Sequence, residues 1–224
     1  MVEGKVSRRR LFVLLVGGPA LILVSGAAIR TLLSLFMERR VFPSLSKAPG
    51  GIVVHHSATK PHNQLFENAR TIDGDHQRRG FGAWYKGKVY HIAYHYVILP
   101  DGTIEKGRPE KCRGGHTRSW KHNRWVGICL VGFFDPGWKN QKYHRPARAQ
   151  MKSLVSLSVR IMDSYRFDQT RILPHKKINP TQCPGKSFPM NEYISLVKAE
   201  LKKSKHTTGL FSGFKGGTDW TRKG

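Results

Sequence analysis

Two histidines and one cysteine, far apart in the sequence, have the residue types and settings of metal ligands. His55 ends an apolar, β-branched run, His175 follows a second apolar run, and Cys183 comes eight residues after His175. Thiolate sulfur together with imidazole nitrogen favours zinc over magnesium or calcium. Three protein ligands leave the fourth tetrahedral position to water, as in catalytic zinc sites, whereas structural sites are closed by four. The sequence therefore predicts one Zn²⁺ held by His55, His175 and Cys183.

The other histidine and cysteines near this set are expected to lie outside it. Side chains of adjacent strand residues point to opposite faces of a sheet, so only one of His55 and His56 faces a given site, and we predict His55. The three cysteines are an odd number and do not form a disulfide framework. Cys129 lies in an apolar strand as a small buried hydrophobe, and Cys112 lies in a polar loop. The alternative interpretation of Cys183 is a free surface thiol.

The elements that must position these ligands alternate between strand and helix patterns. Apolar or alternating runs predict strands, and apolar residues at helical spacing predict helices. A Pro-Asp-Gly turn joins two of the strands into a hairpin. We expect strands at 51–55, 93–99, 103–105, 126–132 and 171–174, helices at 63–80, 146–165 and 191–201, and loops at 81–88 and 112–125. The alternation predicts an α/β domain with a central sheet of about five strands flanked by helices.

The first forty residues do not have the composition of a globular domain. Residues 7–10, Ser-Arg-Arg-Arg, precede an uncharged stretch at 11–29, as in an export signal or an anchor. The paired arginines resemble a twin-arginine signal. The uncharged stretch is barely long enough to span a bilayer, so a cleaved signal and a retained anchor both stay open. We expect residues 1–40 to be a signal peptide or membrane anchor, and the protein to be exported to the periplasm or cell envelope.

The remaining chain divides into three parts. Residues 41–50 have the composition of a linker, and residues 51–203 hold all the predicted strands and helices of one catalytic domain. Residues 204–224 are rich in Lys, Gly, Ser and Thr, which is typical of a basic, disordered tail.

The charge of the chain is strongly positive. Lys and Arg number 39 against 14 Asp and Glu, which gives a formal net charge of +25. Such an excess indicates an anionic partner, and nucleic acid, cell-wall polymers and anionic lipids all fit. The sequence has no basic zipper, zinc-finger spacing or RNP-like run, so we expect no specific nucleic-acid partner. Charge alone therefore does not decide which anionic partner is bound, and the protein is expected to be a monomer.

Six motifs around these residues carry a family resemblance. They are His-x-Ser-Ala-Thr-Lys, Tyr-His-Tyr, Asp-Gly-Thr-Ile, Gly-Gly-His-Thr, Val-Gly-Ile-Cys-Leu-Val-Gly and His-x₇-Cys-Pro-Gly. In this order they resemble the zinc-dependent N-acetylmuramoyl-L-alanine amidases, a family that includes phage endolysins and the peptidoglycan-recognition proteins. The resemblance covers roughly residues 50–200. It implies the type 2 amidase fold, with a mixed sheet, and hydrolysis of the amide between N-acetylmuramic acid and L-alanine in peptidoglycan. With this activity, the positive charge is expected to hold the enzyme on an anionic cell-wall or membrane surface.

The resemblance also implies roles for single residues. The family's two zinc histidines and its zinc cysteine fall on the set named above, and its catalytic tyrosine falls on Tyr94, whose other interpretation is a core aromatic. Thr181 is the second expected catalytic residue. Phage members carry a lysine at this position, whereas peptidoglycan-recognition proteins also have threonine there. His95, Arg108 and His116 are expected to bind substrate. The alternative function is a non-catalytic peptidoglycan-binding module, although members that only bind commonly lack the cysteine.

Overall fold

A five-stranded mixed β-sheet lies at the centre of the fold. The strands are β3 (Ile52–His56), β6 (Tyr96–Ile98), β7 (Ile104–Lys106), β8 (Val126–Leu130) and β9 (Ile172–Pro174). Their order is β7-β6-β8-β3-β9, and every neighbouring pair is parallel except β6 and β7. The antiparallel pair is the hairpin expected at the Pro-Asp-Gly turn. The prediction of an α/β domain with about five strands is confirmed.

The structure is a computed structural model, and it describes residues 12–13, 23–24, 48–59, 67–136 and 144–206. It divides into two compact units, residues 1–41 and 42–224. In the first unit, β1 (Phe12–Val13) and β2 (Leu23–Val24) pair antiparallel. The rest of the predicted leader, residues 41–47 of the predicted linker, and residues 207–224 of the predicted tail lie outside the described residues. Within the described ranges, no helix has the length and apolar character needed to span a bilayer.

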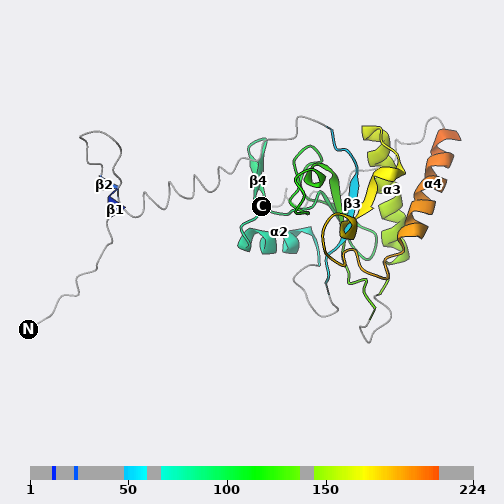
Figure 1. Ribbon diagram of the computed structural model, residues 1–224, viewed down its shortest axis with the longest axis horizontal. Helices are drawn as coiled ribbons and strands as arrows, with labels where there is room; N and C mark the ends of the chain where they lie inside the picture. Colours follow the sequence, from blue (N-terminus) through cyan, green and yellow to red (C-terminus); the bar gives the residue numbers. More distant parts are fainter. Residues whose placement is uncertain (1–11, 14–22, 25–47, 60–66, 137–143, 207–224) are drawn as a thin grey trace, which may run out of the picture. The chain divides into compact units, whose positions relative to one another are not determined.

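Helices cover both faces of the central sheet (Figure 1). On one face, α3 (Arg148–Tyr165) and α4 (Met190–His206) pack over a large apolar core that includes Ile52 and Ile128. On the other face, α2 (Ala69–Arg78) packs over a smaller cluster that includes Val97 and Cys129. Strand residues of the two clusters alternate because successive side chains point to opposite faces. The candidate ligand His55 lies on the α2 side, next to Cys129 in the register of β3 and β8.

Residues 81–88, expected to be a loop, instead contribute to a two-stranded hairpin. It consists of β4 (Ala83–Tyr85) and β5 (Lys88–Tyr90). The two-residue turn of Lys86 and Gly87 has positive φ at both positions, 49° and 83°, which is the backbone geometry that suits a tight hairpin. Ala83 and Tyr85 point inward onto Cys112, so this cysteine is buried in a small cluster of its own.

Candidate metal centre

The sheet topology brings the predicted ligands together at one edge. β3 and β9 are parallel neighbours with Val54 opposite Pro174, so His55 and His175 leave the sheet side by side at the carboxyl ends of their strands. This edge is where open parallel sheets place their ligand sites. The loop after His175 folds back, because the Lys176 N–H donates to the Cys183 carbonyl at 2.8 Å. Residues separated by more than 120 positions in the sequence therefore share one site.

The three side chains have the separations that one metal ion requires. One ligand atom from each of His55, His175 and Cys183 lies within 4.8 Å of the other two. The Cys183 Sγ is 3.7 Å from Nδ1 of His55. Two ligands of one zinc-like ion, each about 2.0–2.3 Å from it, lie at most about 4.6 Å apart, so the set needs only a small adjustment to close on an ion. His55 and Cys183 are buried and His175 is half-buried. The chemistry and spacing of these donors fit a metal site.

Burial sets the protonation of the three ligands. Burial, together with the neighbouring His116 and His175, holds the pKa of His55 well below its usual value of 6.5. Burial likewise lowers the pKa of His175. Both imidazoles are therefore neutral near pH 7 and offer a lone pair. Burial raises the pKa of the Cys183 thiol to about 12, so in the metal-free protein this group keeps its proton. Metal binding must displace that proton.

Tyr94, the predicted catalytic tyrosine, lies beside the three candidate ligands. Its ring centroid is 5.1 Å from that of His55, and its side chain is half-buried against Cys129. Burial, followed by the nearby Cys129 and Cys183 thiols, raises the pKa of Tyr94 well above its usual value of 10. The phenol therefore stays protonated and can donate a hydrogen bond. Thr181 lies close to the cysteine, and its Oγ1 accepts a hydrogen bond from the Cys183 N–H at 3.2 Å.

Of the three predicted substrate residues, only His116 is hydrogen-bonded to one of the three candidate metal ligands. Nδ1 of the buried His116 is 3.0 Å from Nε2 of His55. His95 is buried too, but its ring is held by backbone groups, with Nε2 at 2.8 Å from the Cys112 carbonyl and Nδ1 accepting from the Gly127 N–H at 2.8 Å. The substrate roles of these residues stay predictions.

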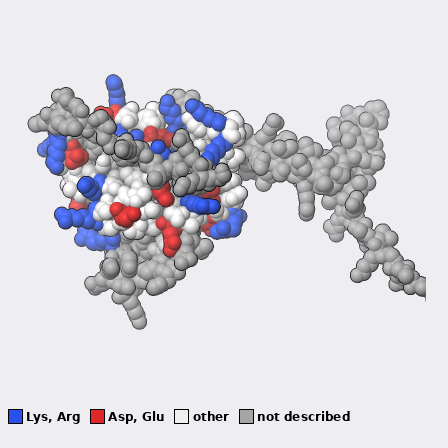
Figure 2. Space-filling view, turned by 180° about the vertical axis from the view of Figure 1, so that it is seen from behind, with Lys and Arg blue, Asp and Glu red and all other residues white. Residues whose placement is uncertain are grey.

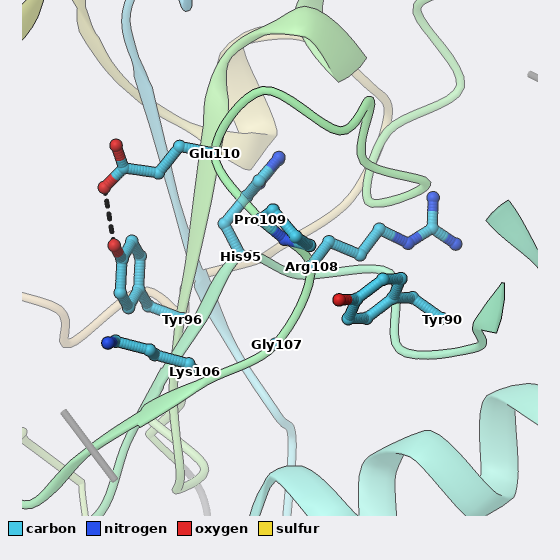
Figure 3. A pocket seen from close by; sticks show the side chains of 8 residues that line it. All are labelled: Tyr90, His95, Tyr96, Lys106, Gly107, Arg108, Pro109 and Glu110. Carbon is cyan, nitrogen blue, oxygen red and sulfur yellow. Dashed lines mark hydrogen bonds between the residues drawn. The ribbon is translucent and has the colours of Figure 1, made fainter. Parts of the chain in front are cut away.

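The side chain of Arg108 is also hydrogen-bonded to backbone groups. It is buried and donates to the Ile92 and Arg113 carbonyls. Together with His95 it lines a cavity of about 150 Å³ (Figure 3). At one side of this cavity the Tyr96 hydroxyl donates to the carboxylate of Glu110 at 2.5 Å, as Figure 3 shows. The loop that carries Arg108 is thereby tied to the sheet.

Two further residues lie at the site although the sequence did not predict them there. Asn179 lies four residues after His175, and its Oδ1 is 2.9 Å from Nε2 of His175. Cys129 was expected only as a buried hydrophobe; it is fully buried, and it also contacts Tyr94. The strand alternation that places Cys129 on the face of His55 would have located it. No periodic signal marks Asn179, because it acts from an irregular loop.

Comparisons with known proteins agree with this geometry. The family model for N-acetylmuramoyl-L-alanine amidase matches residues 45–186. The endolysin of Escherichia phage T7 is 36% identical over 134 residues, which cover 60% of this chain and 79% of the endolysin. The structure of N-acetylmuramoyl-L-alanine amidase LysC from Clostridium intestinale URNW is 33% identical, with a TM-score of 0.51, over 69% of this chain and 85% of that one.

A further neighbour shows likeness in fold alone. The ectodomain complex of peptidoglycan recognition proteins LCa and LCx, solved with bound tracheal cytotoxin, is 17% identical with a TM-score of 0.53 and covers 69% of this chain and 86% of that one. The family match spans the central sheet and all three candidate ligands. The chain therefore belongs to the N-acetylmuramoyl-L-alanine amidase family and is a peptidoglycan hydrolase of the endolysin type.

Proposed function

We propose that the metal of this amidase is zinc, held by His55, His175 and Cys183, and that the bond it cuts joins the lactyl group of N-acetylmuramic acid to L-alanine. The observation that carries the proposal is the convergence of the three ligand atoms to within 4.8 Å beside a protonated phenol. A thiolate with two neutral imidazoles is a donor set that suits zinc. Three ligands leave room for water and substrate.

The residues around the ligands have different roles in the proposed reaction. When bound, zinc polarises the scissile carbonyl and makes a water more acidic. The hydroxyl of Tyr94 donates a hydrogen bond to the oxygen that becomes negative in the transition state. Thr181 holds the turn at Cys183 through the backbone of that residue, so the cysteine keeps its direction toward His55. His175 and Tyr94 are half-buried, so solvent reaches the site at these two residues, and we expect the substrate to approach there.

The direct test is hydrolysis of purified peptidoglycan sacculi. The protein should release soluble muropeptide material and create new L-alanine amino termini, which amino-group labelling and mass spectrometry detect. A strong zinc chelator should stop the reaction, and added zinc should restore it. Release that continues in the metal-depleted protein would contradict the zinc proposal. Appearance of new reducing sugar ends without new amino termini would contradict the proposed bond.

The alternative, a module that binds peptidoglycan without cutting it, makes a different prediction. A pure binding module on this fold has no requirement for a bound metal. Elemental analysis of the purified protein should find about one zinc per chain if the three ligands act as proposed. Binding of sacculi with no zinc and no new amino termini would favour the module.

Zinc affinity should rise with pH. Because burial raises the pKa of Cys183 to about 12, its thiol is protonated near neutrality and must lose one proton when zinc binds. The pKa values of His55 and His175 are lowered, so these rings are already neutral and release none. One displaced proton makes the affinity increase about tenfold per pH unit between roughly pH 6.5 and 8.5. Competition titrations with a chelator of known affinity measure this slope, and a flat profile would contradict it.

We also propose that the positive charge holds the enzyme on an anionic wall or membrane surface. Lysines and arginines are spread over the face that Figure 2 displays, with acidic residues between them. Attraction of this kind is screened by salt, with a Debye length of about 10 Å at 0.1 M and about 3 Å at 1 M. Binding to sacculi should therefore weaken several-fold over that salt range in a sedimentation assay. Binding that does not change with salt would contradict the proposal.

Export is proposed on the sequence alone. The arginines of residues 7–10 and the uncharged stretch 11–29 support a signal or anchor that delivers the domain to the periplasm or cell envelope. Replacing Arg8 and Arg9 with lysine should retain a twin-arginine substrate in the cytoplasm, which cell fractionation measures.

A further inference from the structure

Both ligand imidazoles are hydrogen-bonded through Nε2 to partners outside the ligand set. His55 is bonded to His116, and His175 is bonded to Asn179. Both partners are in turn tied to the loop between β7 and β8, within residues 114–125, which we call the bracing loop. His116 belongs to this loop, and Asn179 accepts from the N–H of its Arg118 at 3.0 Å. One segment thus reaches both metal-binding rings.

The bond from His116 fixes where the proton of His55 lies. Nε2 of His116 is 3.1 Å from the carbonyl of Trp125, and a carbonyl only accepts. His116 is buried and its hydrogen-bond partners are a backbone carbonyl and an imidazole, a setting that favours the neutral ring, so its single proton is on Nε2 and its Nδ1 is an acceptor. Nε2 of His55, at 3.0 Å from that Nδ1, must then be the donor. Nδ1 of His55, which is the atom 3.7 Å from the Cys183 sulfur, keeps its lone pair.

The bond from Asn179 fixes His175 in the same way. A backbone N–H only donates, so the atom of Asn179 that meets the N–H of Arg118 is its carbonyl oxygen. The same oxygen is 2.9 Å from Nε2 of His175, and that nitrogen must carry the proton. Nδ1 of His175 is left as the lone-pair atom. Two separate series of hydrogen bonds therefore give both ligands the same tautomer. One runs from His55 through His116 to the Trp125 carbonyl, and the other runs from the Arg118 N–H through Asn179 to His175.

The ring of His116 has little room to move from this position. A Cβ atom built on Gly127 would lie 2.5 Å from Cδ2 of His116, and one built on Gly114 would lie 2.4 Å from the same atom. These glycines let two backbone segments approach the Cδ2 edge of the imidazole closely. The ring also meets His55 edge-on, with centroids 4.9 Å apart. The acceptor that His116 offers to His55 is therefore held in place by packing as well as by its hydrogen bond.

We propose that His116 and Asn179 are positioning residues through which the bracing loop holds His55 and His175 in the Nε2–H tautomer, with both Nδ1 atoms presented to the metal. The proposal rests on the proposed function in that the group receiving these atoms is zinc. Outer partners of this kind orient the imidazole and raise its basicity, and their loss typically weakens metal affinity 10–100-fold. His116 thereby gains a role in metal binding besides its predicted contact with substrate.

The first test reads the tautomers in the metal-free protein. Long-range ¹H–¹⁵N correlation spectra of the ¹⁵N-labelled wild type distinguish protonated from bare ring nitrogens. We expect protonated Nε2 and bare Nδ1 for both His55 and His175 at pH 7.5. A proton on Nδ1 of either ring would overturn the proposal. The measurement needs no bound zinc and no substrate, so it stands even if the proposed function fails.

The second test compares matched variants by zinc affinity. Asn179→Leu removes the acceptor from a half-buried position and should weaken zinc binding about 10-fold or more. Asn179→Asp keeps an oxygen at that place and should stay within about threefold of wild type. Ser119→Ala, which removes a bond to His122 inside the same loop, is the control for general loosening. Equal zinc affinity of Asn179→Leu and wild type would overturn the proposal.

A variant of His116, the hydrogen-bond partner of His55, completes the test. His116→Phe keeps a ring of similar size and removes the acceptor, and it should show the same loss of zinc affinity together with loss of the Nε2–H signature of His55. If His116→Phe does not fold, the zinc affinities of the Asn179 variants alone test the proposal. A wild-type protein that binds no zinc but shows the expected tautomers would contradict the proposed function. It would still support the roles of His116 and Asn179 in positioning the two histidines.

Discussion

Replacing Cys183 with alanine should lower amide hydrolysis at least about 10³-fold, because a metal of this kind supplies several kcal/mol of transition-state stabilisation. The thiol is the only sulfur among the three ligand side chains, and its Sγ also accepts from the N–H of His56 at 3.3 Å. Its loss leaves two imidazoles, which hold zinc far more weakly. The measurements are the rate of appearance of L-alanine amino termini from sacculi and the zinc content of the purified variant.

The matched control is Cys112→Ala. Cys112 is also a buried, free cysteine, but it packs against the hairpin residues Ala83 and Tyr85 and not against the ligands. Its replacement should change the free energy of unfolding by about 1–2 kcal/mol and leave the rate within about threefold of wild type. A Cys183→Ala variant that keeps both full zinc occupancy and full activity would remove this residue from the metal site.

The candidate ligands and the strands that carry them could be predicted because both leave strong local signals. Apolar runs mark β3, β8 and β9, and metal chemistry demands His and Cys at positions that few other roles explain. The alternation of strands and helices predicts the α/β sheet, whereas the parallel pairing of β3 with β9 is seen only in the structure. The hairpin at residues 83–90 was missed because its strands have three residues each and its turn is Lys-Gly, not the usual Asn-Gly or Asp-Gly.

The outer partners of the ligands could not be predicted for a different reason. His116 and Asn179 act from irregular segments whose path is set by single hydrogen bonds, such as the one from the N–H of Arg118. Neither a period of two nor a period of 3.6 applies to such a segment. The family resemblance predicts that His116 binds substrate, and the structure adds its bond to His55. It also shows that His95 and Arg108 are bonded to backbone groups.

Replacing Tyr94 with phenylalanine should lower kcat about 10²–10³-fold, the usual effect of removing one hydrogen-bond donor from a developing oxyanion. The ring would still pack beside His55 and against Cys129, so the fold and the site's shape are retained. KM should change by only a few-fold, because the lost bond forms mainly in the transition state. Zinc affinity should also be unchanged, since Tyr94 is not among the ligands. Steady-state kinetics on a defined muropeptide, with parallel zinc titrations, separate these effects.

Tyr90→Phe provides the comparison, because Tyr90 lies on β5 and lines the cavity of Figure 3 beside Arg108, outside the ligand set. It should retain kcat within about twofold, as expected for a substitution away from the reacting atoms. Equal kcat in Tyr94→Phe and Tyr90→Phe would show that the phenol of Tyr94 does not stabilise the oxyanion. A loss of zinc from Tyr94→Phe would instead show that the tyrosine supports the ligands. The two results separate a hydroxyl that acts on the substrate from a ring that only shapes the metal site.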